Sequence, residues 1–235
     1  RAWTINANGL ANIGDQHDLL LRAEQEDVHL LMVQETYFKE TSSYRIGKWL
    51  VITTATTPDR KAGVAIFISP KLAGSLVNYV AVSDRLIGAS FLTKDDLLVI
   101  LNQHAPEDKA PEPEREKHRE DLNTILSAIP KRATVLVMGD SNLRWHGRYD
   151  NEHDILGPYI FGHGTSYLDS HKHNNRDMGV ELLRAHKLIY LNSHFNKPPR
   201  NKATFRQQSH NITKKRVNLK DYPMPDTHAE LDQIY

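Results

Sequence analysis

The stretch TVLVMGDSN, residues 134–142, decides the fold. After Thr134 an unbroken apolar run extends from Val135 to Met138; the chain then turns at Gly139 and ends in an acid, a hydroxyl and an amide. A short, continuously apolar run rich in Val and Leu is typical of a buried strand. Asp140 and Asn142 would then place oxygen ligands where the strand leaves the core. Taken alone, these residues could equally form a turn, because Asp and Asn favour turns.

Other apolar runs have the same character, and several of them end in polar residues. They are VHLLMVQE (28–35), GVAIFIS (63–69), LLVILNQH (97–104), LIYLNSHF (188–195) and AELDQIY (229–235). Segments with helical periodicity lie between them, at residues 15–27, 113–129 and 179–187. Interleaved strands and helices predict a layered domain of the α/β or α+β class.

The composition limits the kinds of protein that this chain can be. With 235 residues and no linker, it has the size of one large domain. The absence of cysteine excludes disulfides and thiolate metal sites. No apolar run reaches the length of a membrane span, and the start RAWTIN is not a signal peptide. The net charge of +1 says nothing about partners.

Polar side chains gather where the predicted strands end. They are Asn6 and Asn8 after the first strand, Glu35, His104, Asp140 and Asn142 after later ones, and Asp232 in the last. Oxygen ligands with few carboxylates suit Mg²⁺. Such an ion polarises a phosphoryl oxygen and stabilises the leaving group. Each residue alone is weak evidence, since a strand-ending glutamate is usually solvated and a single histidine usually structural.

The motifs are more informative as an ordered set than one by one. TINANGL (4–10), QET (34–36), NQHAPE (102–107), GDSN (139–142) and LDQI (231–234) occur in this order. Together they resemble the endonuclease/exonuclease/phosphatase superfamily, which includes apurinic endonucleases and deoxyribonuclease-like enzymes. The resemblance covers essentially the whole chain. It implies a DNase I-like fold: a two-sheet β-sandwich flanked by helices, with the active site at one edge.

A finer resemblance concerns the second half of the chain. DILGPYIFGHG (154–164) and the stretch 174–206 are similar to the endonuclease domain of non-LTR retrotransposons, particularly the RTE-like group. This resemblance implies an endonuclease that is one domain of a retroelement polyprotein. A reverse-transcriptase domain would be its partner in the same polyprotein.

The superfamily resemblance assigns the metal and the reacting groups. It implies that Glu35 is the principal metal ligand and that Asn8 lies near the metal. Asp140 aligns with the acid that orients the attacking water or protonates the leaving group, and it counts as a further metal candidate. The expected cofactor is Mg²⁺, for which Mn²⁺ could substitute.

The remaining site residues follow from the same resemblance. Asn6 would orient its neighbours or the phosphate, Asn142 would hold a phosphate oxygen, and Asp232 would orient a catalytic histidine. The third motif departs from the family pattern Tyr-x-Pro-Asn, because His104 and Glu107 stand at its ends. A protonated histidine could replace the tyrosine as a phosphate donor. Glu107 near a phosphate is unfavourable unless it binds metal or points away.

The family ends with a Ser-Asp-His motif one strand beyond LDQI, whereas this chain stops at Tyr235. We expect the single domain, residues 1–235, to be truncated before that strand rather than degenerate. A chain without the histidine should cleave slowly, because general acid–base groups contribute about 10²–10⁴-fold. It should still bind duplex DNA.

Residues 195–220 carry eight Lys/Arg and no Asp/Glu. Such a run is often a solvated loop, but a one-sided basic segment also attracts a phosphate backbone. In the family, a hairpin before LDQI reaches toward DNA. The nucleic-acid-binding candidates are Arg206, Lys214, Lys215 and Arg216, together with Arg144, Trp145 and Arg148 after the Asp-x-Asn motif. Trp145 could equally be a core residue.

These observations predict a Mg²⁺-dependent phosphodiesterase that nicks DNA and leaves a 3′-hydroxyl. The resemblance places it inside the cell, and in the nucleus if it serves a retroelement. Another phosphoesterase of the same superfamily, an abasic-site nuclease or a phosphatase, is a second possibility. A third is a catalytically degenerate domain kept as a binding or structural module.

Overall fold

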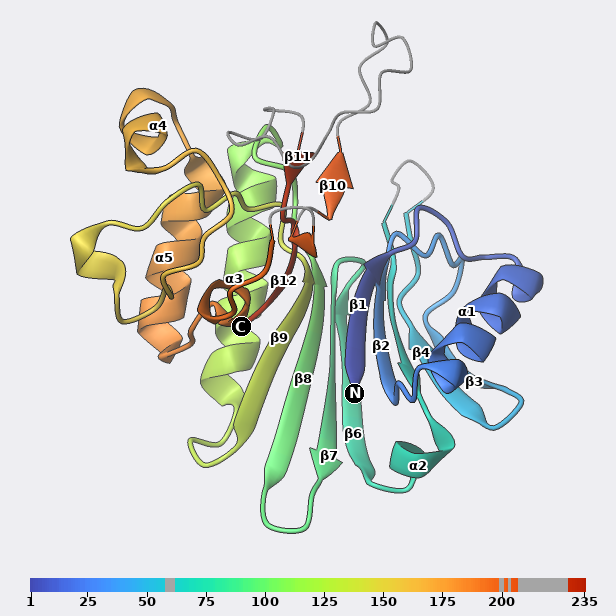
Figure 1. Cartoon of the computed structure of the whole chain (residues 1–235). Helices are drawn as coiled ribbons and strands as arrows, with labels where there is room; N and C mark the ends of the chain where they lie inside the picture. Colours follow the sequence, from blue (N-terminus) through green and yellow to red (C-terminus); the bar gives the residue numbers. More distant parts are fainter. Residues whose placement is uncertain (58–61, 199–200, 203, 207–227) are drawn as a thin grey trace, which may run out of the picture. The chain divides into compact units, whose positions relative to one another are not determined.

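The computed structural model in Figure 1 describes residues 1–57, 62–198, 201–202, 204–206 and 228–235, with the backbone alone at 205–206 and 228–229. The chain forms two compact units. The first unit consists of Arg1–Pro106 and Pro111–Ser141, and the second of Glu107–Ala110 and Asn142–Tyr235.

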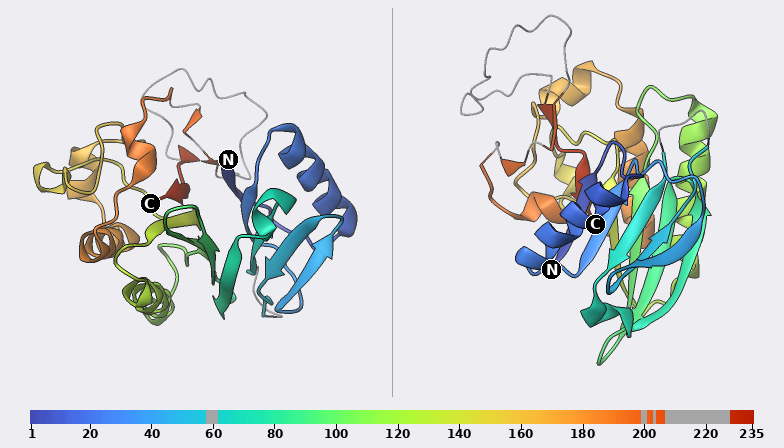
Figure 2. Two further views of the ribbon diagram at one scale, coloured as in Figure 1. Left: turned by 90° about the horizontal axis from the view of Figure 1, so that it is seen from below. Right: turned by 90° about the vertical axis from the view of Figure 1, so that its right-hand side faces the viewer.

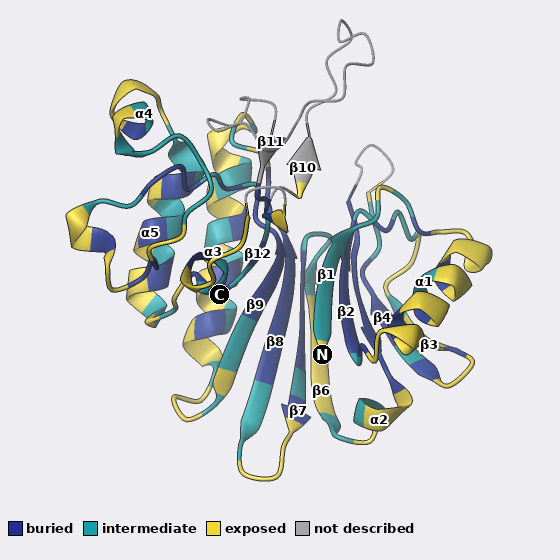
Figure 3. Ribbon diagram, viewed as in Figure 1, coloured by how far each residue is buried: buried dark blue, intermediate teal, exposed yellow. Residues whose placement is uncertain are grey.

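The first unit contains a mixed sheet in the order β1-β2-β5-β4-β3. Its strands are β1 (Ala2–Asn6), β2 (Leu30–Gln34), β5 (Val64–Ile68), β4 (Trp49–Thr53) and β3 (Ser42–Ile46). β1 and β2 run parallel, and the other neighbours run antiparallel. β2 and β5 are buried along their whole length, as Figure 3 shows for β2. The strands expected within 28–35 and 63–69 are therefore confirmed.

A second sheet in this unit runs in the order β9-β8-β7-β6. Its strands are β9 (Thr134–Asp140), β8 (Leu97–His104), β7 (Leu86–Leu92) and β6 (Leu76–Ser83). β8 and β9 pair in parallel, so their carboxyl ends meet at one edge. The strands expected within 97–104 and 134–142 are confirmed.

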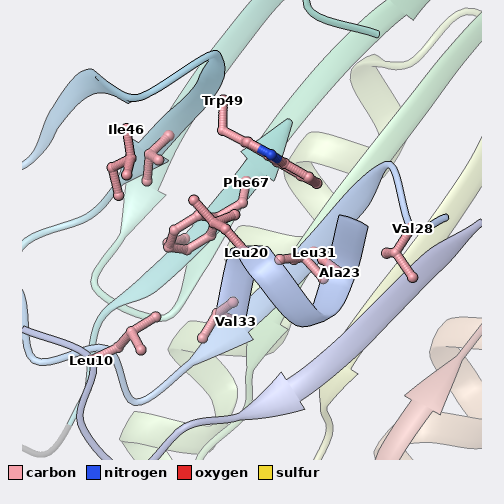
Figure 4. Packing of buried hydrophobic residues seen from close by; sticks show 11 residues of the cluster. Leu10, Leu20, Ala23, Val28, Leu31, Val33, Ile46, Trp49 and Phe67 are labelled. Carbon is pink, nitrogen blue, oxygen red and sulfur yellow. The ribbon is translucent and has the colours of Figure 1, made fainter. Parts of the chain in front are cut away.

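Helices cover the outer faces of these two sheets (Figure 2). α1 (Ile13–Gln25) begins at Asn12, whose side chain accepts the Gly14 N–H, and it buries Leu20 and Ala23. These side chains pack on Leu31 and its neighbours in the first sheet (Figure 4). α3 (Glu112–Ala128) lies against the second sheet, and α2 (Pro70–Ala73) is a single turn. The predicted helices 15–27 and 113–129 are confirmed.

A buried amide pair joins the two sheets just below the strand ends. Gln34 donates to the side chain of Asn102 at 2.6 Å. Asn102 in turn donates to the backbone carbonyls of Val33 and Ala65, at 3.0 and 2.8 Å. Gln34 and Asn102 are fully buried, so leaving either one unpaired would be costly. This network fixes β2 against β8 and therefore fixes the position of the next residue, Glu35.

His118 on α3 makes the unit sensitive to acid. Its ring is buried and lies 3.2 Å from the Gln103 Oε1 atom. Burial, followed by the charges of Arg85 and His104, lowers the pKa of His118 to about 3, while Asp121 opposes the shift. Below the ordinary histidine pKa, His118 is protonated in the unfolded chain but stays neutral in the folded chain. Stability should therefore fall as the pH drops from about 6.5 toward 3.

His118→Gln should make this acid dependence shallower. A glutamine amide reaches about as far as the Nε2 atom and does not titrate. The slope of unfolding free energy against pH should fall by up to about 1.4 kcal/mol per pH unit. Urea unfolding at a series of pH values between 4 and 8 measures it. Equal slopes for the variant and the wild-type protein between pH 4 and 6 would contradict the assignment.

The second unit is mainly helical and irregular in its described part. Its elements are η1 (Asp150–Glu152), α4 (Thr165–Ser170), α5 (Asn174–His186), η2 (Leu191–His194), β10 (Phe205–Arg206), β11 (His228–Ala229) and β12 (Asp232–Ile234). β10 and β11 pair antiparallel. α5 confirms the helix predicted at 179–187 and begins five residues earlier. β12 is the short strand within the run 229–235.

The prediction of a strand at residues 188–195 is wrong. This segment forms the 3₁₀ turn η2, and only Tyr190 makes an isolated bridge, to Leu156. Ser193 explains the turn, because its hydroxyl donates to the Tyr190 carbonyl at 2.5 Å and accepts the Gly157 N–H at 2.7 Å. Local side-chain bonds of this kind compete with a sheet ladder.

The core of the second unit is built on one tryptophan and one arginine. Trp145 stacks on Tyr190 with ring centroids 5.3 Å apart, and its indole donates to Gln233 at 3.1 Å. Arg176 donates to both carboxylate oxygens of Glu152, at 2.9 and 2.6 Å. It also donates to two backbone carbonyls at 3.1 Å. The guanidinium therefore holds several loop segments together.

Candidate active site

Two parallel strand pairs end at the same place in the first unit. Asn6 lies opposite Gln34 at the end of β1 and β2, and His104 lies opposite Asp140 at the end of β8 and β9. The carboxyl ends of parallel strands therefore supply these side chains from both sheets. Glu35 is the first residue after β2.

The Asn6 amide joins Glu35 and Asp140. Its Nδ2 atom lies 2.9 Å from Glu35 Oε1 and 3.0 Å from Asp140 Oδ2. An amide nitrogen carries two hydrogens, so it can donate one to each carboxylate. The other end of the amide is also used, because the Asn6 Oδ1 atom accepts the backbone N–H of Asn8 at 3.2 Å. Residues predicted separately from the sequence thus form one connected group.

The backbone around this group is strained. Asn8, Glu35 and Tyr37 have φ values of 47°, 51° and 58°, in the left-handed region. Asn tolerates this region, but Glu and Tyr seldom adopt it. Backbone bonds hold the conformation: Gly9 donates to the Glu35 carbonyl at 2.7 Å, and Thr36 donates to the Gly63 carbonyl at 3.1 Å. Strain of this kind clusters at functional sites and directs attention to Glu35.

Tyr37 belongs to the site, although the sequence reasoning missed it. Its hydroxyl donates to Glu35 Oε2 at 2.7 Å and lies 3.0 Å from Asn8 Oδ1. No sequence signal identifies it, because Tyr37 reaches Glu35 through the left-handed backbone at these two residues and not through strand alternation.

His104 lies beside the glutamate in a buried position. Its Nε2 atom is 3.7 Å from Glu35 Oε1, and the residue is 6% exposed. Burial lowers the pKa of His104, and although Asp140 raises it, Arg85 lowers it further. The lowered pKa disfavours the protonated form, which would be the better phosphate donor in place of the tyrosine. A neutral imidazole can still donate one N–H or accept one proton.

The donor atoms suit a hard divalent cation. Glu35 Oε2 and Asn8 Oδ1 both lie within hydrogen-bonding distance of the Tyr37 hydroxyl, so the two oxygens face the same space. Among the described residues no three His, Cys, Asp or Glu side chains are arranged to hold a metal. One carboxylate, one amide oxygen and several waters form a set that Mg²⁺ accepts. Asp140 is separated from Glu35 by the Asn6 amide.

Two of the predicted catalytic residues belong to the second unit. Asn142 has a φ of 45°, and its carbonyl accepts the side-chain amide of Asn175 at 3.0 Å. The backbone N–H of Asp232 donates to the Thr204 hydroxyl at 3.1 Å. Their predicted roles toward a phosphate and a histidine remain predictions.

The residues predicted to bind nucleic acid lie in different environments. Trp145 is 2% exposed, so the expectation that it lies along a bound strand is wrong, and the core alternative is correct. Arg148 is half-buried and donates to the Leu156 carbonyl at 3.0 Å, and Arg144 is also half-buried. For Arg206 the structure describes the backbone alone, and Lys214, Lys215 and Arg216 lie outside the described residues.

Comparisons with known proteins agree with this architecture. The model of the Endonuclease/Exonuclease/phosphatase family matches residues 3–205. The endonuclease domain of TRAS1, a telomere-specific non-LTR retrotransposon, is similar with a TM-score of 0.59 and 15% identity, over 98% of this chain and 83% of that one. An AP endonuclease from Leishmania major gives a TM-score of 0.64 at 10% identity, over 99% and 77% of the two chains.

A further structure and one curated protein are also similar. An AP endonuclease from Archaeoglobus fulgidus has a TM-score of 0.57 at 15% identity, over 98% of this chain and 84% of that one. At these identities the similarity concerns the fold. Craniofacial development protein 2 from Bos taurus is 25% identical over 146 residues, which is 62% of this chain. That match spans 23% of the curated relative's length.

Proposed function

This chain belongs to the endonuclease/exonuclease/phosphatase family, and on that premise we propose that it is a metal-dependent phosphodiesterase that nicks DNA and leaves a 3′-hydroxyl. The observation that carries the proposal is the Asn6 amide bound to both Glu35 and Asp140. It joins the ends of two parallel strand pairs into one polar site next to a strained glutamate.

Nucleases of this superfamily generally use divalent metal ions. We propose Mg²⁺, with Mn²⁺ as a substitute, held by Glu35 and the side-chain oxygen of Asn8. When bound, such an ion polarises a phosphoryl oxygen and lowers the pKa of a bound water. The residues present fit it, because their oxygens already converge on one hydroxyl.

The protein's own groups would then arrange the phosphate and its protons. Asp140 would orient the attacking water or protonate the leaving oxygen, and Asn6 would hold that carboxylate in place through its N–H. The His104 ring would offer one donor or one acceptor beside Glu35. Asn142 and Asp232 keep their proposed roles toward a phosphate oxygen and a histidine.

DNA is the proposed substrate because of the basic segment at residues 195–220, which carries eight Lys/Arg and no acids. Not all of these cations are available to a phosphate. Lys202 is buried, its ammonium donates to the Tyr159 carbonyl, and burial lowers its pKa. We propose that Lys214, Lys215 and Arg216 contact the DNA backbone. Arg144, Arg148 and Arg206 are further candidates for such contacts.

Neutralising Lys214, Lys215 and Arg216 together should weaken binding to all duplex sequences alike. Each lost phosphate contact removes about 0.9 from the slope of log K against log salt, so the slope should fall by up to about 2–3. Fluorescence anisotropy with two unrelated duplexes at several salt concentrations measures it. An unchanged slope would show that these cations do not contact the DNA backbone.

We further propose that the chain serves a retroelement. The motifs at 154–164 and 174–206, which resemble the RTE-like group, support this, with a reverse-transcriptase domain in the same polyprotein as the partner. Its place of action would be the nucleus. Across the described part of the chain, no helix is both long and apolar enough to span a bilayer.

The proposed activity can be separated from its alternatives in one set of assays. The full-length protein is incubated with supercoiled plasmid, with a duplex that contains an abasic site, and with an inositol phosphate. We expect Mg²⁺-dependent nicking of the plasmid, with ends that a DNA polymerase extends. Cleavage of the abasic duplex alone would indicate a repair-type nuclease, and release of phosphate from inositol phosphate would indicate a phosphatase.

A further inference from the structure

Glu35 is held by two donors, one on each carboxylate oxygen. Asn6 Nδ2 binds Oε1 at 2.9 Å, and the Tyr37 hydroxyl binds Oε2 at 2.7 Å. A glutamate side chain has several rotatable bonds, and two donors on different oxygens determine both the position and the plane of its carboxylate. Each oxygen retains further lone-pair capacity for a cation.

Tyr37 itself has little freedom. Its backbone φ of 58° is unusual for a tyrosine, and its N–H donates to the Ala62 carbonyl at 3.2 Å. Its ring packs closely on Gly9, where an added Cβ would lie 3.2 Å from the ring. Gly9 has a φ of +109°, which also favours glycine at that position. The position of the Tyr37 hydroxyl is therefore restricted by its backbone and by the packing of its ring.

The hydroxyl remains a donor at neutral pH. A tyrosine hydroxyl keeps its proton there, because its ordinary pKa is about 10. With one proton it can serve one acceptor at a time, and the shorter, charge-assisted contact is the one to Glu35. Asn8 Oδ1, 3.0 Å from the same hydroxyl, then keeps its lone pairs for a cation or water in the same space.

We infer that Tyr37 is a positioning residue for the metal site: its hydroxyl orients the Glu35 carboxylate so that Oε2 faces the same space as the Asn8 oxygen. This inference rests on the proposed metal-dependent function and extends it to a residue that the motif resemblance does not assign. Donors that orient metal ligands in this way typically contribute 10–100-fold to metal affinity.

The test compares metal binding by Tyr37→Phe and by a matched control in the full-length protein. Tyr44→Phe is the control, because Tyr44 in the same unit also donates its hydroxyl to one side chain, Gln16, at 2.9 Å. Titration with Mn²⁺, followed by electron paramagnetic resonance, measures the free ion without any substrate. Tyr37→Phe should weaken binding about 10–100-fold, and Tyr44→Phe should leave it unchanged.

A double-mutant cycle distinguishes positioning from a general structural effect. If Tyr37 acts through Glu35, its replacement should weaken Mn²⁺ binding in the wild-type background and have no further effect in Glu35→Gln. Melting temperatures of the two tyrosine variants should be similar. Wild-type affinity in Tyr37→Phe, or an equal loss in Tyr44→Phe, would overturn the inference while the proposed function stands. A wild-type protein that binds no Mn²⁺ would overturn both.

Discussion

Glu35→Gln should slow DNA nicking by the full-length protein by about 10²–10⁴-fold, because a metal ion and its ligand supply several kcal/mol of charge stabilisation in phosphoryl transfer. The glutamine keeps the shape of the side chain and an oxygen that can accept from Asn6. It removes the negative charge that would hold the cation. Plasmid nicking rates across a range of Mg²⁺ concentrations measure both the rate and the metal requirement.

The fold should survive this change. Glu35 and Asp140 share one Asn6 amide, so removing one of the two neighbouring carboxylates relieves repulsion. Glu40→Gln is the matched control, since Glu40 is an exposed acid in the same unit. It should nick at the wild-type rate. A Glu35→Gln variant that nicks as fast as Glu40→Gln would remove Glu35 from the site.

Arg176→Met should destabilise the protein by about 3–5 kcal/mol, which is the usual cost of removing one partner from a buried ion pair. Arg176 is 4% exposed and Glu152 is 3% exposed. Methionine would fill part of the space but remove the guanidinium from the buried Glu152 carboxylate and from two backbone carbonyls. Urea unfolding, followed by tryptophan fluorescence, measures the loss, because Trp145 lies in the same core.

Arg184→Met provides the comparison on the same helix. Arg184 is exposed, and its ion pair with Asp154 is long at 3.4 Å, so its loss should cost less than about 1 kcal/mol. Replacing Glu152 by Leu together with Arg176→Met should recover part of the stability, since no unpaired charge then stays buried. Equal losses of unfolding free energy for Arg176→Met and Arg184→Met would show that the buried ion pair contributes no more to stability than the exposed one.

The apolar runs of the sequence predict β2, β5, β8 and β9, but not β4 and β7, which are also largely buried. Residues 97–101 are continuously apolar because both faces of the strand are covered, and β8 extends from that run to His104. β6 is mostly exposed, so its residues carry no comparable signal (Figure 3). The apolar run 188–195 wrongly predicts a strand. Its apolar residues and the buried Tyr190 resemble a strand pattern, but hydrogen bonds of the Ser193 hydroxyl stabilise a turn.

The candidate site is only partly predictable for a related reason. Order and family resemblance select Glu35 and Asp140, which are strand-end acids. The bond from Asn6 to Asp140 spans 134 residues of sequence and becomes visible only when the sheets are packed. For Trp145 the sequence leaves two possibilities open, because an aromatic residue after a motif fits a DNA contact and a core position equally well. Tyr37 needed the left-handed turn at Glu35 to reach its partner.

The most direct test of a metal-dependent phosphodiesterase centred on Glu35 is a time course of supercoiled plasmid relaxation by the full-length protein, with Mg²⁺ and with a chelator. The account predicts open circles that form with Mg²⁺, do not form with the chelator, carry 3′-hydroxyl ends that a polymerase extends, and are lost in Glu35→Gln. Relaxation that persists in the chelator, or plasmid that stays supercoiled at every Mg²⁺ concentration, would contradict it.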